Sequence, residues 1–143
     1  MEIKRLVLNP LMENTYVVWD DTKECIIIDA GNMTARDDAQ LMDFIREQGL
    51  KPVMAVNTHG HFDHVAGVAM LKESYGVQFA CSSKDKFLVD SAAQQSAMFG
   101  MQCQAAPAID LDLEEVESIT FGATTLQVIK TPGHTPGHVS LFN

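Results

Sequence analysis

All five histidines of this 143-residue chain lie in two short segments. The first segment, THGHFDH at positions 58–64, contains three histidines and an aspartate: His59, His61, Asp63 and His64. The second segment, TPGHTPGH at positions 131–138, contains His134 and His138. Imidazole and carboxylate groups bind divalent metals, and clusters of such residues typically mark a metal site. Three histidines and an aspartate within six residues therefore predict metal binding rather than a plain polar loop.

The spacing within the first segment indicates how a metal site could form. The segment follows a predicted strand at 53–58, so His59 and His61 can project to the same side of a short loop and hold one metal. Gly60 between them allows a tight backbone path. The aspartate and the third histidine can face a second metal. Imidazoles with a carboxylate and no thiolate suit zinc, manganese or iron, of which zinc is the commonest. Spacing alone leaves the two histidines of the second segment equally placed to complete the site.

Strands and helices are predicted to alternate around these segments. Apolar runs bounded by Asn, Pro, Asp and Gly predict an antiparallel meander in the N-terminal third. A helix is expected to begin after Thr34, a favoured N-cap residue, and to end at Gly49. The predicted strands are 3–9, 15–19, 25–29, 53–58, 77–81, 118–121, 124–130 and 139–142. Two more helices are predicted at 65–75 and 82–99, and 101–117 is expected to be a surface connection. This alternation predicts an α/β layered fold.

Charge and composition exclude several classes of function. Ten Lys and Arg against nineteen Asp and Glu give a net charge of −9, which disfavours binding to a nucleic-acid backbone. No stretch approaches the ~20 apolar residues of a membrane span, and the first residues show no signal-peptide pattern. Cys25, Cys81 and Cys103 are far apart and form no CxxC pair. We therefore expect reduced thiols in a cytoplasmic protein, no thiol catalysis, and no nucleic-acid or membrane partner.

Three segments together resemble a known family. NTHGHFDHVAG resembles the HxHxDH motif of the metallo-β-lactamase superfamily, and TPGHTPGHVSLF resembles the segment that supplies its next histidine ligand. IIIDAG resembles the end of an N-terminal strand in that family. The glyoxalase II-like branch of small hydrolases is the most similar. The resemblance implies an αββα sandwich, of which this chain covers mainly the N-terminal half.

The resemblance also implies a role for each candidate residue. Three residues are implied to bind the first metal: His59, His61 and His134. Asp63 and His64 would bind the second, with two zinc ions in a complete site and iron or manganese as alternatives. Asp63 would also act in catalysis by orienting a metal-bound water. Asp29 matches an acid that lies close to the metals and supports their ligands. His138 falls where the family has no ligand.

The chain departs from the family pattern at its C-terminal side. The family uses a bridging aspartate and a last histidine from segments beyond the TPGH turn, and this sequence ends at Asn143 without them. We therefore expect residues 1–143 to form a single domain that is truncated at this side. Three explanations remain open: a fragment of a longer product, a homodimer whose partner chain supplies the ligands, or an inactive relative.

The function implied by the resemblance is metal-dependent hydrolysis of a small molecule. Two metals lower the pKa of a bound water to roughly 7 and polarise a carbonyl group. A thiolate leaving group has a pKa near ~8.5, so a thioester such as an acyl-glutathione is a natural substrate. Lactone, β-lactam and phosphoester hydrolysis stay open. The alternatives from other classes are a mononuclear iron persulfide dioxygenase and a non-catalytic metal-binding module.

Overall fold

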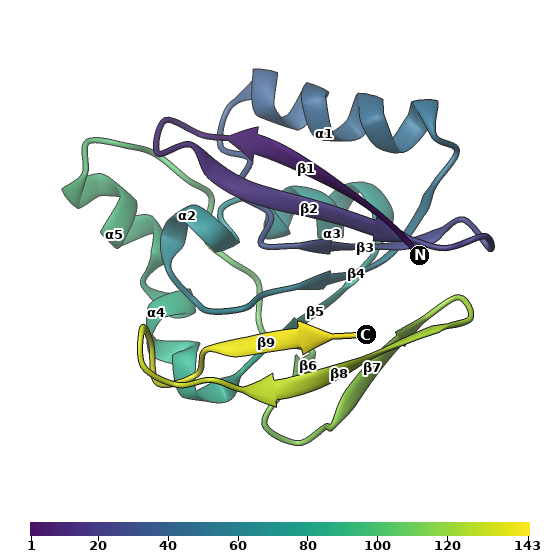
Figure 1. Ribbon diagram of the computed structural model, residues 1–143. Coiled ribbons are helices and arrows are strands. Elements are labelled where there is room, and N and C mark those ends of the chain that lie inside the picture. Colours follow the sequence, from purple (N-terminus) through teal and green to yellow (C-terminus); the bar gives the residue numbers. More distant parts are fainter.

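The computed structural model describes residues 1–143, whose strands form two sheets with helices on the outer face of the larger one (Figure 1). The larger sheet has the order β1-β2-β3-β4-β5-β6. Its strands are β1 Glu2–Leu8, β2 Glu13–Trp19, β3 Glu24–Ile28, β4 Lys51–Val56, β5 Gln78–Cys81 and β6 Leu111–Asp112. The smaller sheet has the order β7-β8-β9, with β7 Ser118–Phe121, β8 Thr124–Lys130 and β9 Val139–Phe142. The structure thus contains one layer of helices and the two sheets of the predicted αββα sandwich.

The N-terminal meander is confirmed, since β1 pairs with β2 and β2 with β3 in antiparallel fashion. The direction then changes, because β3, β4, β5 and β6 run parallel. Parallel neighbours need a crossover connection, which is commonly helical. Helix α1, Ala35–Glu47, joins β3 to β4, and α3, Val68–Tyr75, precedes β5. Thr34 caps α1 in a capping box with Asp37, as expected for an N-cap threonine.

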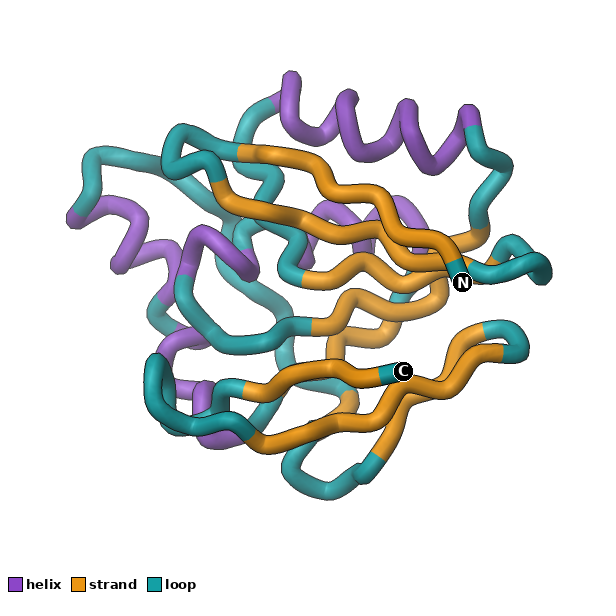
Figure 2. The backbone as a smooth tube through the Cα atoms, in the orientation of Figure 1, coloured by secondary structure: helices purple, strands orange, loops and turns teal.

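The larger sheet is buried on both faces at its central strand β3, which explains the continuous apolar run of that strand. Cys25 and Ile27 face the helices and belong to one core cluster with Leu41 and Phe79. Ile26 faces the other way, into a second cluster that includes Phe121 of the smaller sheet. A strand buried on both faces is apolar throughout rather than alternating. Figure 2 shows the strands enclosed between the helices and the smaller sheet.

Two predicted helices differ in the structure. The helix predicted at 65–75 begins at Val68 and is preceded by a separate turn of helix, α2 Phe62–Val65. The single helix predicted at 82–99 is instead a 3₁₀ turn followed by two short helices: Ser83–Asp85, α4 Lys86–Asp90 and α5 Ala92–Met98. The hydroxyl of Ser91 donates a hydrogen bond of 2.8 Å to the carbonyl of Phe87. A serine that bonds back to the preceding turn bends a helix, and this one lies at the break.

The connection predicted at 101–117 also contains one short strand, β6. The longest helix, α1, has 13 residues. No helix combines the length and apolar character needed to cross a membrane.

Candidate metal centre

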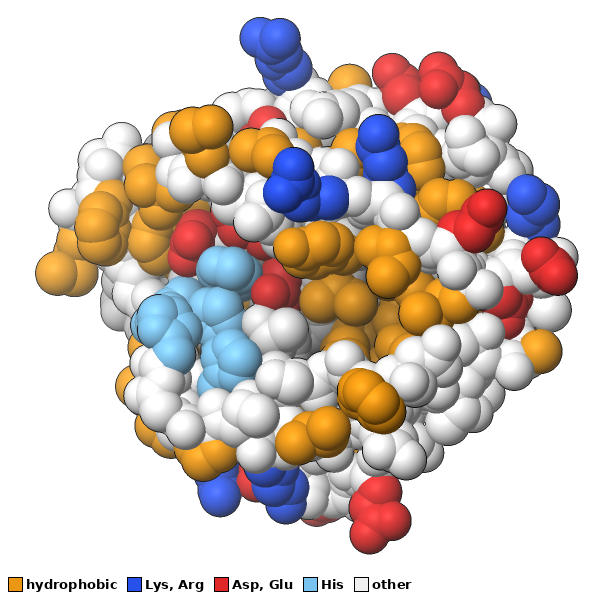
Figure 3. Space-filling model, viewed as in Figure 1, with side chains coloured by type: hydrophobic (Ala, Val, Ile, Leu, Met, Phe, Trp, Pro, Cys, Tyr) orange, Lys and Arg blue, Asp and Glu red, His pale blue; other side chains and the backbone are white.

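The two histidine segments meet at one end of the sandwich, where the parallel strands end. His59 and His61 lie on the loop after β4, and Asp29 directly follows β3. His134 lies in the turn between β8 and β9, so it comes from the other sheet. Figure 3 shows the histidine side chains gathered on one face, with acidic side chains beside them. The carboxyl ends of parallel strands are where α/β folds place their binding sites, and this chain follows that rule.

Three imidazoles form the centre of the cluster. Each of His59, His61 and His134 offers one nitrogen, and these nitrogens lie within 4.8 Å of one another. The ring centroids of His59 lie 5.0 Å from His61 and 4.9 Å from His134. The structure thus brings together the three residues assigned to the first metal.

A chain of hydrogen bonds determines which ring nitrogen of His59 carries the proton. The Thr58 hydroxyl donates to Oδ2 of Asp29 at 2.6 Å, so it can only accept from Nδ1 of His59, which lies 2.9 Å away. The proton therefore resides on Nδ1, and the lone pair of Nε2 points away from it. Nε2 is buried and has no hydrogen-bond partner. A buried nitrogen without a hydrogen-bond partner destabilises the folded protein, and a metal ion bound at this point would accept its lone pair.

Burial favours the neutral form of His59 and His61, which is the form that a metal requires. Burial, together with the smaller effect of the neighbouring His64, lowers the pKa of His59 to about 4. Burial also lowers the pKa of His61, with His134 adding to the effect. Neutral imidazoles at physiological pH are ready to act as ligands without losing a proton first.

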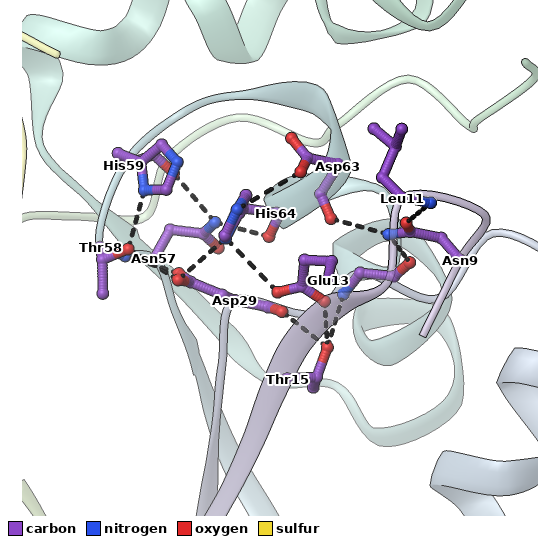
Figure 4. Close-up of polar contacts among 11 residues, drawn as sticks. Asn9, Leu11, Glu13, Thr15, Asp29, Asn57, Thr58, His59, Asp63 and His64 are labelled. Atoms are coloured by element: carbon purple, nitrogen blue, oxygen red, sulfur yellow. Dashed lines mark hydrogen bonds and ion pairs between the residues drawn. The ribbon is translucent and has the colours of Figure 1, made fainter. Parts of the chain in front are cut away.

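His64 lies among three carboxyl groups (Figure 4). Its Nδ1 is 3.1 Å from Oδ2 of Asp29 and 3.4 Å from Oε1 of Glu13. Its Nε2 is 3.4 Å from Oδ2 of Asp63. Burial by itself would lower the pKa of His64, but the hydrogen bond to Asp29 and the charges of Asp29 and Asp63 raise it.

Asp29 orients His64 directly and His59 through Thr58. Its carboxylate accepts hydrogen bonds from the backbone N–H and the hydroxyl of Thr58, at 2.7 and 2.6 Å, and contacts His64. It forms a second potential ligand group with His59 and His64. Its backbone φ of 56° is unusual for a residue other than glycine, although aspartate tolerates it better than most. The turn directs the carboxylate toward Thr58 and His64, which both belong to the first histidine segment.

The remaining two sequence candidates lie at the edge of the cluster. Asp63 is half-buried beside His64 but belongs to neither potential ligand group. His138 also belongs to neither group, and its Nδ1 lies 2.9 Å from the hydroxyl of Thr131. The geometry therefore separates His134 from His138, which spacing alone could not do.

Glu13 is a buried acid that the sequence motifs did not identify. The residue is 4% exposed, and Oε2 accepts a hydrogen bond of 2.6 Å from the Thr15 hydroxyl while Oε1 has no hydrogen-bond partner. Burial raises the pKa of Glu13 to about 9, and the nearby Asp29 adds to the rise. The carboxyl is therefore neutral at pH 7. Nothing local marks this position in the sequence, because its neighbours Asp29 and Asp63 are far away along the chain.

Asp85 is a second acid outside the motifs. It is fully buried and accepts three hydrogen bonds, from the Gly60 N–H at 2.9 Å, the Gly137 N–H at 2.7 Å and the Thr135 hydroxyl at 2.7 Å. Two of these donors follow His134 along the chain, and the third lies between His59 and His61. Nothing in the local sequence distinguishes Asp85 from Asp90 in the same segment.

Two pockets adjoin the cluster on different sides. One, of about 430 Å³, is polar and is lined by residues that include Glu13, Asp29 and His64. The other, of about 390 Å³, is largely apolar, with His61 and Asp63 in its wall beside Phe99 of the segment after α5. The centre therefore borders on both a polar and an apolar space, each large enough for part of a small molecule.

The donor set fits a divalent metal, since it combines neutral imidazoles, an orphaned buried nitrogen and nearby carboxylates without any thiolate. The crystal structure of TTHA1623 in a di-iron-bound form has the same fold, with a TM-score of 0.84 and 32% identity. That match covers 97% of this chain and 66% of that one.

Proteins similar to this chain include two kinds of enzyme. Hydroxyacylglutathione hydrolase GloC of Haemophilus influenzae is 34% identical over 149 residues, which cover 99% of this chain and 66% of that protein. Persulfide dioxygenase ETHE1 of Mus musculus is 36% identical over 127 residues, which cover 88% of this chain and 41% of that protein. The chain thus spans about two thirds of the length of the first relative and less than half of the second.

The family itself follows from a match along most of the chain. The model of the metallo-beta-lactamase superfamily matches residues 8–143, which include both histidine segments and the strand that ends at Asp29. The chain belongs to the metallo-β-lactamase superfamily, as its motifs predict.

Proposed function

We propose that this chain carries the metal-binding part of a hydrolase that cleaves thioesters of the acyl-glutathione type. The observation that carries the proposal is the convergence of three imidazoles from two sheets, with Nε2 of His59 buried and without a hydrogen-bond partner. The similarity to a hydroxyacylglutathione hydrolase supports the choice of substrate class.

The proposed ligands of the first metal follow the geometry of the cluster, and those of the second follow the resemblance of the sequence motif. His59, His61 and His134 would hold one metal, and Asp63 with His64 would hold a second; zinc is the proposed ion, with iron or manganese as alternatives. When bound, such metals supply a hydroxide at neutral pH and polarise the carbonyl that it attacks. Asp29 keeps the proton of His64 on Nδ1 directly, and that of His59 through Thr58. Both histidines therefore present Nε2 to the centre.

The substrate class agrees with the chemistry of the surrounding side chains. The carboxylate of Asp63 lies at the wall of both pockets, where it can orient the attacking water. Within residues 1–143 no lysine or arginine lines either pocket, so neither residue type assists the leaving group from this part of the chain. A thiolate needs little assistance, because its conjugate thiol has a pKa near ~8.5.

The test combines metal analysis with two assays. Purified protein is loaded separately with zinc and with iron, its metal content is measured, and hydrolysis of S-lactoylglutathione is followed by release of free thiol. We expect thioester cleavage that is lost in His61→Ala and retained in His138→Ala. Full metal content without cleavage of any thioester would refute the proposed activity.

A second function has one observation in its favour, the 36% identity to a persulfide dioxygenase. This alternative would use a single iron, and its assay is oxygen consumption with sulfite production from glutathione persulfide. Sulfite production by the iron-loaded protein, together with no thioester cleavage by the zinc-loaded protein, would favour it over hydrolysis.

A further inference from the structure

We propose that Asp85 is a positioning residue that sets where His134 stands relative to His59 and His61. The inference rests on the proposed metal centre, and it assigns a task to a residue outside both histidine motifs. Asp85 lies in the 3₁₀ turn after β5, and its side chain is completely buried.

The hydrogen bonds of Asp85 join the two segments that carry the three imidazoles. Oδ2 accepts from the N–H of Gly60, between His59 and His61, and from the hydroxyl of Thr135. Oδ1 accepts from the N–H of Gly137. Hydrogen bonds to an ionised carboxylate are roughly twice as strong as those between neutral groups. No other side chain in the structure is hydrogen-bonded to both segments.

The turn that carries His134 has little else to hold it in place. His134 is exposed, and the bonds within the turn are local ones, from Thr131 N–H to the carbonyl of His138 and from Gly133 N–H to that of Thr135. One backbone bond, from Val139 N–H to the carbonyl of Thr58, connects the turn to the first segment. Without Asp85, the two segments could shift relative to each other about that single bond.

Gly60 in the first segment and Gly137 in the second both leave room for Asp85. Neither Gly60 nor Gly137 has a positive φ, so neither is required by its backbone conformation. A Cβ atom at Gly60 would lie 2.9 Å from the Asp85 carbonyl oxygen, and one at Gly137 would lie 2.8 Å from Oδ1 of Asp85 and 2.7 Å from the Ser82 hydroxyl. Gly60, expected to allow a tight backbone path, thus also gives Asp85 room to approach.

The test measures metal affinity directly, with cobalt(II) as the probe. Asp85→Asn replaces one acceptor oxygen with an amide that donates, which leaves one oxygen for three donors. We expect its affinity for cobalt to fall about tenfold or more, as for other residues that orient metal ligands, and the visible absorption of the bound cobalt to change. Neither measurement requires any enzymatic activity.

Asp112→Asn is the matched control. Asp112 also accepts two backbone hydrogen bonds, from Ser83 and Glu114 at 2.9 Å each, but it contacts neither histidine segment. We expect this variant to lose thermal stability while its cobalt affinity stays within about twofold of the wild-type value. Equal loss of cobalt affinity in both variants would show that Asp85 acts only through general stability.

A milder variant covers the case in which Asp85→Asn does not fold. Thr135→Val keeps the shape of the side chain and removes one of the three donors, so a smaller loss of cobalt affinity is expected. The proposal would be overturned if a folded Asp85→Asn protein bound cobalt with the affinity and absorption of the wild type. If Asp85→Asn is unfolded, the same result in Thr135→Val would overturn it. Failure of the wild-type protein to bind cobalt would instead refute the metal centre itself.

Discussion

The buried carboxyl of Glu13 makes the stability of the metal-free protein depend on pH, and Glu13→Gln should remove that dependence. Burial raises the pKa of Glu13 from 4.5 to about 9 in the folded state. Between these values the unfolded chain has lost a proton that the folded protein keeps. The unfolded state is therefore favoured increasingly as pH rises through this window. Glutamine has nearly the same shape and carries no charge at any pH.

The size of the effect follows from the width of the window. Each pH unit within it contributes about 1.4 kcal/mol. The wild-type protein should therefore lose up to about 4 kcal/mol relative to Glu13→Gln between roughly pH 5 and pH 8. His59 acts in the opposite direction, because its lowered pKa destabilises the folded protein only as pH falls below its unfolded value. That contribution is the same in both proteins, so it cancels in their difference.

The assay is urea unfolding of both proteins after metal removal, at several pH values across the window. Glu47→Gln serves as the control, since Glu47 is an exposed glutamate on α1. The control should follow the wild-type protein at every pH. A difference between wild type and Glu13→Gln that stays constant from pH 5 to pH 8 would refute the reasoning, because it would show that Glu13 has an ordinary pKa.

Three further predictions concern the ligands, the apolar pocket and the fold. His59→Ala should lose bound metal, as measured by elemental analysis, whereas His138→Ala should keep nearly all of it; equal losses would contradict the ligand assignment. Phe99→Ala should reduce the preference for a hexanoyl over an acetyl thioester severalfold in kcat/KM, since each buried methylene contributes about fourfold. Phe87→Ala on α4, outside that pocket, should leave the preference unchanged. Thr34→Ala should lower the free energy of unfolding by about 1 kcal/mol through loss of the α1 cap, and an unchanged urea midpoint would show that the cap contributes nothing.

Motifs, strands and caps that depend only on adjacent residues could be predicted from the sequence. The HxHxDH segment, the second histidine segment and the strand that ends at Asp29 are local patterns, and the family match covers all of them. The N-terminal meander and the Thr34 cap are local in the same sense. The structure confirms both.

Features that depend on distant contacts could not be predicted in this way. Asp85 lies 25 residues from Gly60 and 52 from Gly137, and only the fold brings them together. Glu13 is unusual because of its burial, which its sequence neighbours do not reveal. The break at Ser91 has no local signal, because a serine is tolerated within a helix. Only the hydrogen bond from its hydroxyl to the carbonyl of Phe87 identifies the bend.

The division of the three imidazoles between two sheets gives a bound metal a mechanical role. His59 and His61 extend from the larger sheet and His134 from the smaller one, so an ion held by all three is a cross-link between the layers. Such a cross-link restricts local opening, because the β8–β9 hairpin can separate from β4 only when the ion is released. Amide hydrogen exchange in β8 and β9 should therefore slow on metal binding, while α1, on the opposite face of the larger sheet, changes little. The stiffness of this end of the molecule would thus depend on whether the proposed metal is bound.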